Sequence, residues 1–79
     1  MLSTLGKYDK LKELLDKALT VPGVDKSNLY NEYGIMYEQL GEYDKAIDRY
    51  RECAHKTLNK DTLQRAKDSI QRCQEKKSL

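Results

Sequence analysis

The fold of this chain is decided between Tyr30 and Tyr50, where the sequence reads YNEYGIMYEQLGEYDKAIDRY. On both sides of Gly41, its apolar and aromatic residues recur at the spacing of one face of an α-helix. A glycine between two such stripes predicts a turn too short for anything other than an antiparallel helical hairpin. The stretch therefore predicts two helices, over residues 27–40 and 42–57, joined at Gly41.

The start of the second of these helices has a copy earlier in the chain. The segments LGKYDK at residues 5–10 and LGEYDK at residues 40–45 are identical at five of six positions, and the apolar stripes that follow keep the same register. Internal similarity at an offset of 35 residues is typical of repeat proteins. The first copy predicts a helix over residues 7–20, which Pro22 and Gly23 separate from the hairpin.

The repeat also suggests how the chain begins. Leu2 and Leu5 align with Tyr37 and Leu40, which occupy the last turn of a predicted helix. We therefore expect the sequence to start near the end of a helix and to be cut from a longer array; the alternative is that residues 1–5 are a short lead-in. About three repeats are usually needed for independent stability. A shorter array predicts a concentration-dependent oligomer, formed through the exposed face of the first helix.

The last part of the chain predicts a helix over residues 61–76 whose surface is more polar than that of the other predicted helices. Its narrow apolar stripe consists of Leu63, Ala66, Ile70 and Cys73. Charged and polar residues surround this stripe, as in the terminal capping helix of a repeat array. We expect Asp61 to cap its start, with Gln64 reaching back to the cap, and Ser27 to cap the helix over residues 27–40.

The decisive stretch matches a known motif. It contains Tyr30-x₂-Tyr33-Gly34-x₂-Tyr37 followed by Ala46-x₃-Tyr50. This pattern is similar to the signature W-x₂-L-G-x₂-Y…A-x₃-F…P of the tetratricopeptide repeats. It departs from the signature where tyrosines replace Trp and Leu, and where Leu58 stands in place of the terminal proline. Without that proline, the second helix is expected to run on a little or to end in a different turn.

The resemblance implies an all-α fold of antiparallel helix-turn-helix repeats, an α-solenoid with about four helices in one domain. It covers residues 27–59 as a complete repeat and residues 5–23 as the second helix of a preceding one. Residues 61–76 would then be the capping helix that ends the array. Gly34 and Ala46 are small, which would let the two helices of the complete repeat approach closely.

The resemblance also implies a binding surface. In this family the first helices of successive repeats line a groove that holds a peptide or helix of a partner protein. The matching positions here are Asn28, Asn31, Glu32, Ile35, Glu38 and Gln39. Amides can pair with a peptide backbone, and the two glutamates favour a ligand with basic residues. The Lys, Asn and Arg pattern with which one subfamily grips a C-terminal carboxylate is absent from these positions.

The sequence offers no constellation for catalysis, a metal or another cofactor. His55 is the only histidine, and no Cys or carboxylate cluster with ligand spacing surrounds it. Cys53 and Cys73 fall on apolar stripes, which predicts buried thiols and leaves a disulfide between them open. The isolated glycines form no phosphate loop. We therefore expect a non-catalytic interaction module.

Two alternatives remain beside partner binding. The chain could be a passive spacer or self-associating repeat within a longer array. The last helix could instead bind nucleic acid through its basic residues, which are Arg65, Lys67, Arg72, Lys76 and Lys77. Interleaved acidic residues dilute that charge, and the helix carries no aromatic residue to stack on bases.

The sequence also bears on the cellular compartment of the protein. None of its apolar stretches is long enough to span a bilayer, and the first residues lack the features of a secretory signal. Two cysteines without a CxxC spacing form no dense disulfide framework. These features favour an intracellular protein, cytoplasmic or nuclear.

Overall fold

The computed structural model describes residues 4–78, and this range contains four α-helices and no strand. The helices are α1 (Thr4–Leu19), α2 (Lys26–Gln39), α3 (Tyr43–Lys56) and α4 (Lys60–Lys77). The predicted all-α class is confirmed. The helix bounds agree with the predicted ones to within one residue, except at the start of α1.

The start of α1 was predicted wrongly. The helix begins at Thr4 instead of residue 7, and Gly6 lies inside it although the repeat aligns Gly6 with the turn residue Gly41. A glycine permits a turn without enforcing one, and it costs an isolated helix only about 1 kcal/mol. Leu2, expected in the last turn of a preceding helix, lies outside the described residues.

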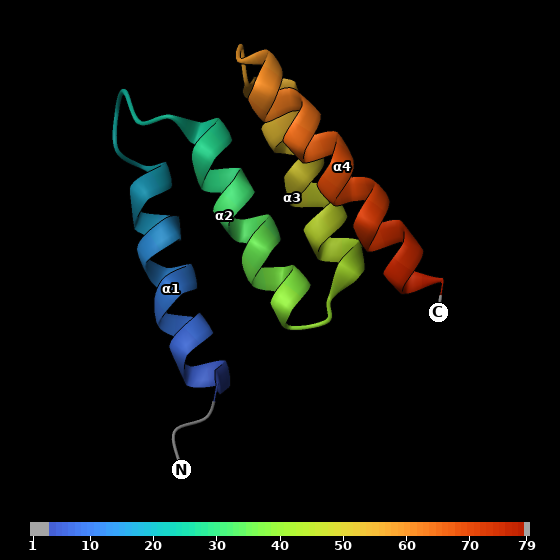
Figure 1. Cartoon of the computed structure of the whole chain (residues 1–79). Helices are drawn as coiled ribbons and strands as arrows, with labels where there is room; N and C mark the ends of the chain where they lie inside the picture. The colour runs from blue at the N-terminus through green and yellow to red at the C-terminus, as the bar shows by residue number, and fades with distance from the viewer. Residues whose placement is uncertain (1–3, 79) are drawn as a thin grey trace.

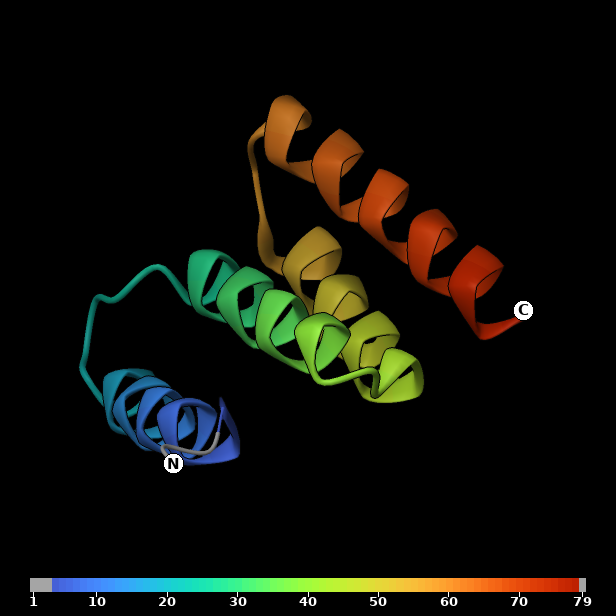
Figure 2. The same ribbon diagram turned by 60° about the horizontal axis from the view of Figure 1, so that its bottom comes forward.

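The helices follow one another across the molecule and alternate in direction (Figures 1 and 2). The central pair is α2 and α3; α1 packs mainly against α2, and α4 packs against α3. The molecule measures 41 × 37 × 15 Å. In so thin a slab each helix meets its neighbours along the chain, as in repeat architectures. Among the described helices, none is both long and apolar enough to cross a membrane.

The hairpin between α2 and α3 closes as the sequence predicts. Gly41 has a φ of 80°, a conformation open to glycine, and its amide donates to the carbonyl oxygen of Glu38 at 3.1 Å. The amide of Glu42 donates to the carbonyl oxygen of Tyr37 at 2.9 Å. These two bonds form a Schellman motif, which satisfies carbonyl groups left free at the helix end.

The predicted cap of α2 was wrong. Asp25, and not Ser27, is the capping residue: its side chain accepts hydrogen bonds from the backbone amides of Ser27 and Asn28. Ser27 is buried, and its hydroxyl donates to the same Asp25 oxygen at 2.6 Å. A cap must precede the amides that it satisfies, so the helix starts two residues earlier than the serine suggested.

The cap of α4 was misplaced in the same way. Asn59 caps the helix, and its Oδ1 accepts the amides of Asp61 at 2.8 Å and Thr62 at 3.2 Å. Gln64 does not reach back to the cap; its Nε2 donates to Asp68 at 3.0 Å. The predicted capping box is therefore wrong, because Asp61 already lies inside the first turn of α4.

We expect Asn59→Ala to lower the free energy of unfolding by about 1 kcal/mol, the usual cost of losing a helix cap. Asp61→Ala removes a carboxylate from the same helix turn but leaves the cap in place, so its loss should be smaller. Urea denaturation followed by circular dichroism measures both. Equal losses in the two variants would argue against the Asn59 cap.

The connection between α3 and α4 settles the question raised by the missing proline. α3 ends at Lys56, and Thr57 has an extended backbone with ψ of 141°. The helix therefore does not run on; it ends in a different turn. Leu58, which follows, is fully exposed.

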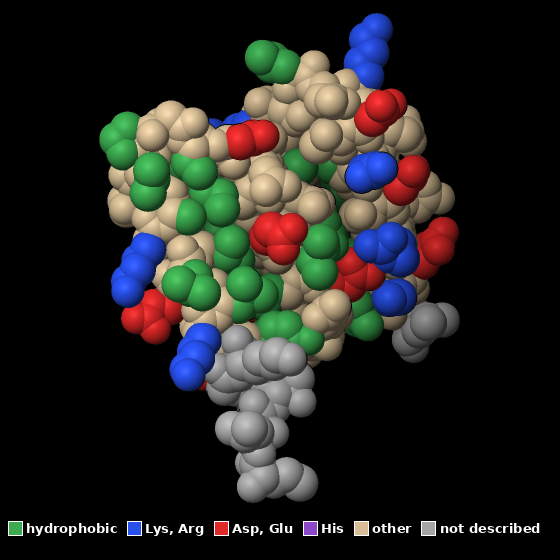
Figure 3. All heavy atoms as spheres, turned by 60° about the vertical axis from the view of Figure 1, so that its left-hand side comes forward, with side chains coloured by type: hydrophobic (Ala, Val, Ile, Leu, Met, Phe, Trp, Pro, Cys, Tyr) green, Lys and Arg blue, Asp and Glu red, His purple; other side chains and the backbone are tan. Residues whose placement is uncertain are grey.

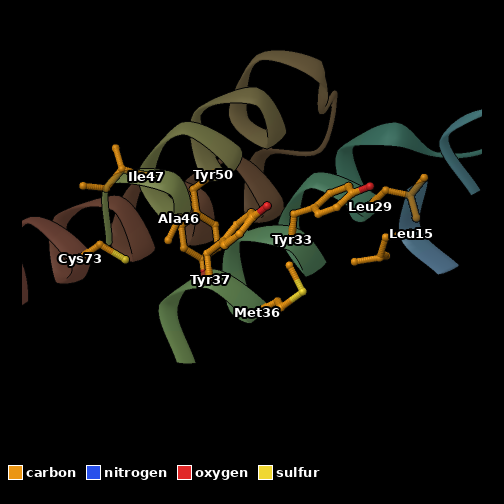
Figure 4. Close-up of a cluster of buried hydrophobic side chains, with 9 residues drawn as sticks. All are labelled: Leu15, Leu29, Tyr33, Met36, Tyr37, Ala46, Ile47, Tyr50 and Cys73. Atoms are coloured by element: carbon orange, nitrogen blue, oxygen red, sulfur yellow. The ribbon is translucent and has the colours of Figure 1, made fainter. Parts of the chain in front are cut away.

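The core forms where α2, α3 and the neighbouring helices meet (Figure 4). Its buried members are Leu15, Leu29, Tyr33, Met36, Tyr37, Ala46, Ile47, Tyr50 and Cys73. Gly34 lies against the ring of Tyr50, so close that an added Cβ would stand 2.6 Å from a ring carbon. The predicted close approach of α2 and α3 is thereby confirmed. Cys53 and Cys73 are free thiols and fully buried, as predicted, while His55 is exposed.

Candidate partner-binding face

The six predicted binding residues lie along one side of α2 by their helical spacing, and we call this side the α2 face. Its members are Asn28, Asn31, Glu32, Ile35, Glu38 and Gln39. Ile35, at its centre, is 38% exposed, although the other large apolar side chains of α2 are buried or half-buried. Asn28 is exposed, and Asn31 and Glu32 are half-buried. Ile35 therefore offers one apolar contact among the polar side chains of this face.

Glu38 differs from the other members of the α2 face because this chain already binds it. Arg72 of α4 donates to both of its carboxylate oxygens, from Nε at 2.6 Å and from Nη2 at 2.7 Å. The Tyr50 hydroxyl donates at 2.9 Å, and the Lys76 ammonium lies 3.4 Å away. The carboxylate thus links α2 to α3 and α4, and its side chain is only 11% exposed.

The electrostatics of Glu38 follow from these contacts. The hydrogen bonds of Arg72 lower the pKa of the Glu38 carboxyl to about 2 from the ordinary 4.5, because they favour its charged form. Burial, together with the bond to Glu38, raises the pKa of the Tyr50 hydroxyl above its usual value of 10. At neutral pH Glu38 is therefore ionised and the Tyr50 hydroxyl is neutral. The positive charge of Arg72 compensates the negative charge of Glu38.

Two further hydrogen bonds tie α1 to α2. The Tyr8 hydroxyl of α1 donates to Gln39, the last member of the α2 face. The hydroxyl of the buried Tyr33 donates to Asp16 of α1, which also forms an ion pair with Lys12 at 3.0 Å. The bond from Tyr33, followed by that from Lys12, lowers the pKa of the Asp16 carboxyl. Gln39 is therefore engaged within the chain as well.

The two asparagines of the α2 face line a small polar hollow between the starts of α2 and α4. The hollow has a volume of about 200 Å³. Its walls are Asp25, Ser27, Asn28, Asn31, Thr57, Asn59, Thr62 and Arg65. Among these, Asp25 and Asn59 are occupied as helix caps, whereas Arg65 forms no ion pair with any described residue. The hollow therefore offers amide, hydroxyl and guanidinium groups to a polar ligand group.

Three of the five α4 residues considered above for nucleic-acid binding form ion pairs with carboxylates. Arg72 and Lys76 bind Glu38, and Lys77 forms an ion pair with Asp44 of α3. Arg65 and Lys67 remain without such a partner among the described residues. Nucleic-acid backbones are bound by free cationic side chains, each of which neutralises a phosphate. The ion pairs thus reduce the basic surface that the sequence suggested for nucleic acid.

Sequence reasoning missed the link between Glu38 and Arg72. The two residues are 34 positions apart, close to the repeat length, so they occupy equivalent turns of α2 and α4. A Glu and an Arg separated by about one repeat length were the only sequence signal for this ion pair. In the part of the chain that the structure describes, no cluster of His, Cys, Asp or Glu is arranged to hold a metal ion.

Comparisons with known proteins close the description of this face. Neither family models, nor curated proteins, nor solved structures gave a match to the chain.

Proposed function

We propose that this chain is a tetratricopeptide-type repeat unit that binds a segment of a partner protein through the α2 face, without catalysing a reaction. The observation that carries the proposal is the exposure of Ile35 in a helix whose other large apolar residues are buried or half-buried. Support for the repeat type comes from the signature positions: Gly34 packs on Tyr50 where α2 and α3 meet, and α4 lies on α3 beyond them.

The binding surface that we propose is narrower than the six motif positions. The side chains of Glu38 and Gln39 already accept hydrogen bonds within the chain, from Arg72 and Tyr8. Four positions remain: the amides of Asn28 and Asn31 beside the polar hollow, the apolar Ile35, and Glu32. With Glu38 neutralised by Arg72 and Lys76, only Glu32 is left to favour a basic ligand. The proposed partner segment therefore needs an apolar residue for Ile35 more than it needs basic ones.

Photo-crosslinking tests this proposal. A crosslinking amino acid at position 35 of the full chain is expected to capture a partner from the source cells, whereas the same group at the exposed position 58 is not. The partner should also be lost from Ile35→Glu and retained by Leu58→Glu in quantitative affinity capture. Recovery of the same proteins by both variants would remove the α2 face as the binding surface.

A further inference from the structure

The outward side of α1 is a second unusual surface. We call it the α1 face: Lys10, Leu14 and Lys17 of α1 and Val21 just after the helix, with the half-buried Leu11 and Ala18 beside them. Leu14 is 65% exposed and Val21 52%. The described part of the chain has four exposed large apolar residues, and the α1 face holds two of them. Figure 3 shows apolar side chains spread over this side of the molecule, with Lys and Arg side chains toward its margins and an acidic side chain among the apolar ones near the middle.

The internal repeat shows which kind of element covers such a face. α3 is the repeat partner of α1, and four of its residues lie against α2. Lys45 is over the Tyr37 ring at 5.7 Å, Arg49 is over Tyr33 at 5.0 Å, Tyr50 packs on Gly34, and Lys56 is over Tyr30 at 5.8 Å. Their counterparts 35 positions earlier are Lys10, Leu14, Leu15 and Val21. On α3 this face lies against an antiparallel helix, and Arg49 is half-buried there, whereas its counterpart Leu14 on α1 is 65% exposed.

We propose that the α1 face docks an amphipathic helix of a partner protein, seated on α1 as α2 is seated on α3. This inference goes beyond the proposed function, because it adds a second binding surface and specifies the class of partner. The docked helix would carry large apolar residues at positions i, i+3 and i+7, the spacing of Tyr30, Tyr33 and Tyr37 in α2. Where α3 presents Arg49 and Lys56, the first copy has Leu14 on α1 and Val21 just after its end, so aliphatic contacts replace cation–aromatic ones.

The charges at the edge select an acidic helix. Lys10 and Lys17 flank Leu14, and both are exposed. The nearest carboxylate to Lys17 is that of Glu13, 3.8 Å away, and both side chains are more than two-thirds exposed, so this pair is weak. Glutamates along the edge of a docked helix would pair with the two lysines. A second copy packed antiparallel would instead place these lysines against their own equivalents, which is unfavourable.

The test uses a fluorescent synthetic helix of about 18 residues, long enough to populate helix in solution. Leucines form its apolar stripe and glutamates its edges. Fluorescence anisotropy with the full chain is expected to show saturable binding. Leu14→Glu should weaken that binding about tenfold or more, since it removes a buried apolar contact. Leu58→Glu is the matched control: the same change at an exposed leucine away from α1 should leave binding unaltered.

Charge reversal gives a second measurement. Lys10→Glu/Lys17→Glu should bind the glutamate-edged helix more weakly and a lysine-edged helix more tightly. Circular dichroism verifies that each variant stays folded. Equal binding of a scrambled peptide, or equal losses in Leu14→Glu and Leu58→Glu, would overturn the proposal.

The remaining outcomes separate this inference from the proposed function. A dimer in sedimentation that Leu14→Glu abolishes would show that a second copy covers the α1 face, and the helix proposal would fall. Loss of the crosslinked partner in Ile35→Glu but not in Leu14→Glu would leave the proposed function standing and reject the α1 face. Loss in both would support one partner that spans α1 and α2.

Discussion

Gly34→Val is expected to lower the free energy of unfolding by about 3 kcal/mol, the upper end of the cost of overpacking a core. The added Cβ would stand 2.6–2.8 Å from three carbons of the Tyr50 ring. Tyr50 is fully buried, so its ring has no free space into which to move. A core this small rarely supplies more than about 3–5 kcal/mol in total. Urea denaturation should therefore show a variant that is largely unfolded at room temperature.

The smaller change Gly34→Ala tests the same contact through the sign of the change in the free energy of unfolding. Alanine favours a helix over glycine by about 1 kcal/mol, yet here we expect a net loss because the Cβ meets the Tyr50 ring. In a Tyr50→Leu background the ring is gone, and the same change should stabilise the protein. This reversal is the coupling that a double-mutant cycle measures. Stabilisation by Gly34→Ala in the otherwise unchanged chain would contradict the close packing.

Acid is expected to destabilise the protein through Glu38. Its pKa is lowered from 4.5 to about 2 on folding, chiefly by Arg72. The contribution is therefore complete above pH 4.5 and is lost as the pH falls through about 2. The shift corresponds to at most about 3 kcal/mol, and solvent around the half-exposed Arg72 should reduce this to about 1–2 kcal/mol.

Glu38→Gln isolates this contribution. At neutral pH the variant should be less stable by about 1–3 kcal/mol, because Arg72 and the buried Tyr50 hydroxyl lose a charged acceptor. Between pH 4.5 and 2 the difference from the unchanged protein should shrink. Glu75→Gln removes an exposed carboxylate that pairs with no described residue, and it serves as the control. A difference that stays constant with pH would contradict the role of Glu38.

The predicted hairpin depended on signals that are local in the sequence. Helical spacing around Gly41 and the repeated segments located the helices, because each depends on neighbours a few positions away. The helix caps were harder to predict from the sequence. Asp25 and Ser27 are both good capping residues, and the choice between them depends on where the packed helix starts. The misplaced start of α1 has another origin, because Gly6 permits a turn without enforcing one.

The sequence predicted which residues lie on the α2 face, but it did not predict which of their side chains are already bound within the chain. The motif placed six residues on one side of α2, and it could not show that α4 would bring Arg72 and Lys76 onto Glu38. The Tyr8 bond to Gln39 likewise needed the distance between α1 and α2. Contacts between residues more than 30 positions apart depend on how helices pack, and the spacing along one helix does not encode that packing.

The sequence alone determined that this chain forms four helices with a hairpin at Gly41, and that Gly34, Ala46 and Tyr50 belong to its centre. Those features follow from helical periodicity and residue size, which act over short distances. The tertiary structure decided which of the predicted binding residues remain free. Glu38 and Gln39 are taken by α4 and α1, whereas Ile35 and Leu14 stay exposed, because only the assembled helices determine which side chains find partners within the chain.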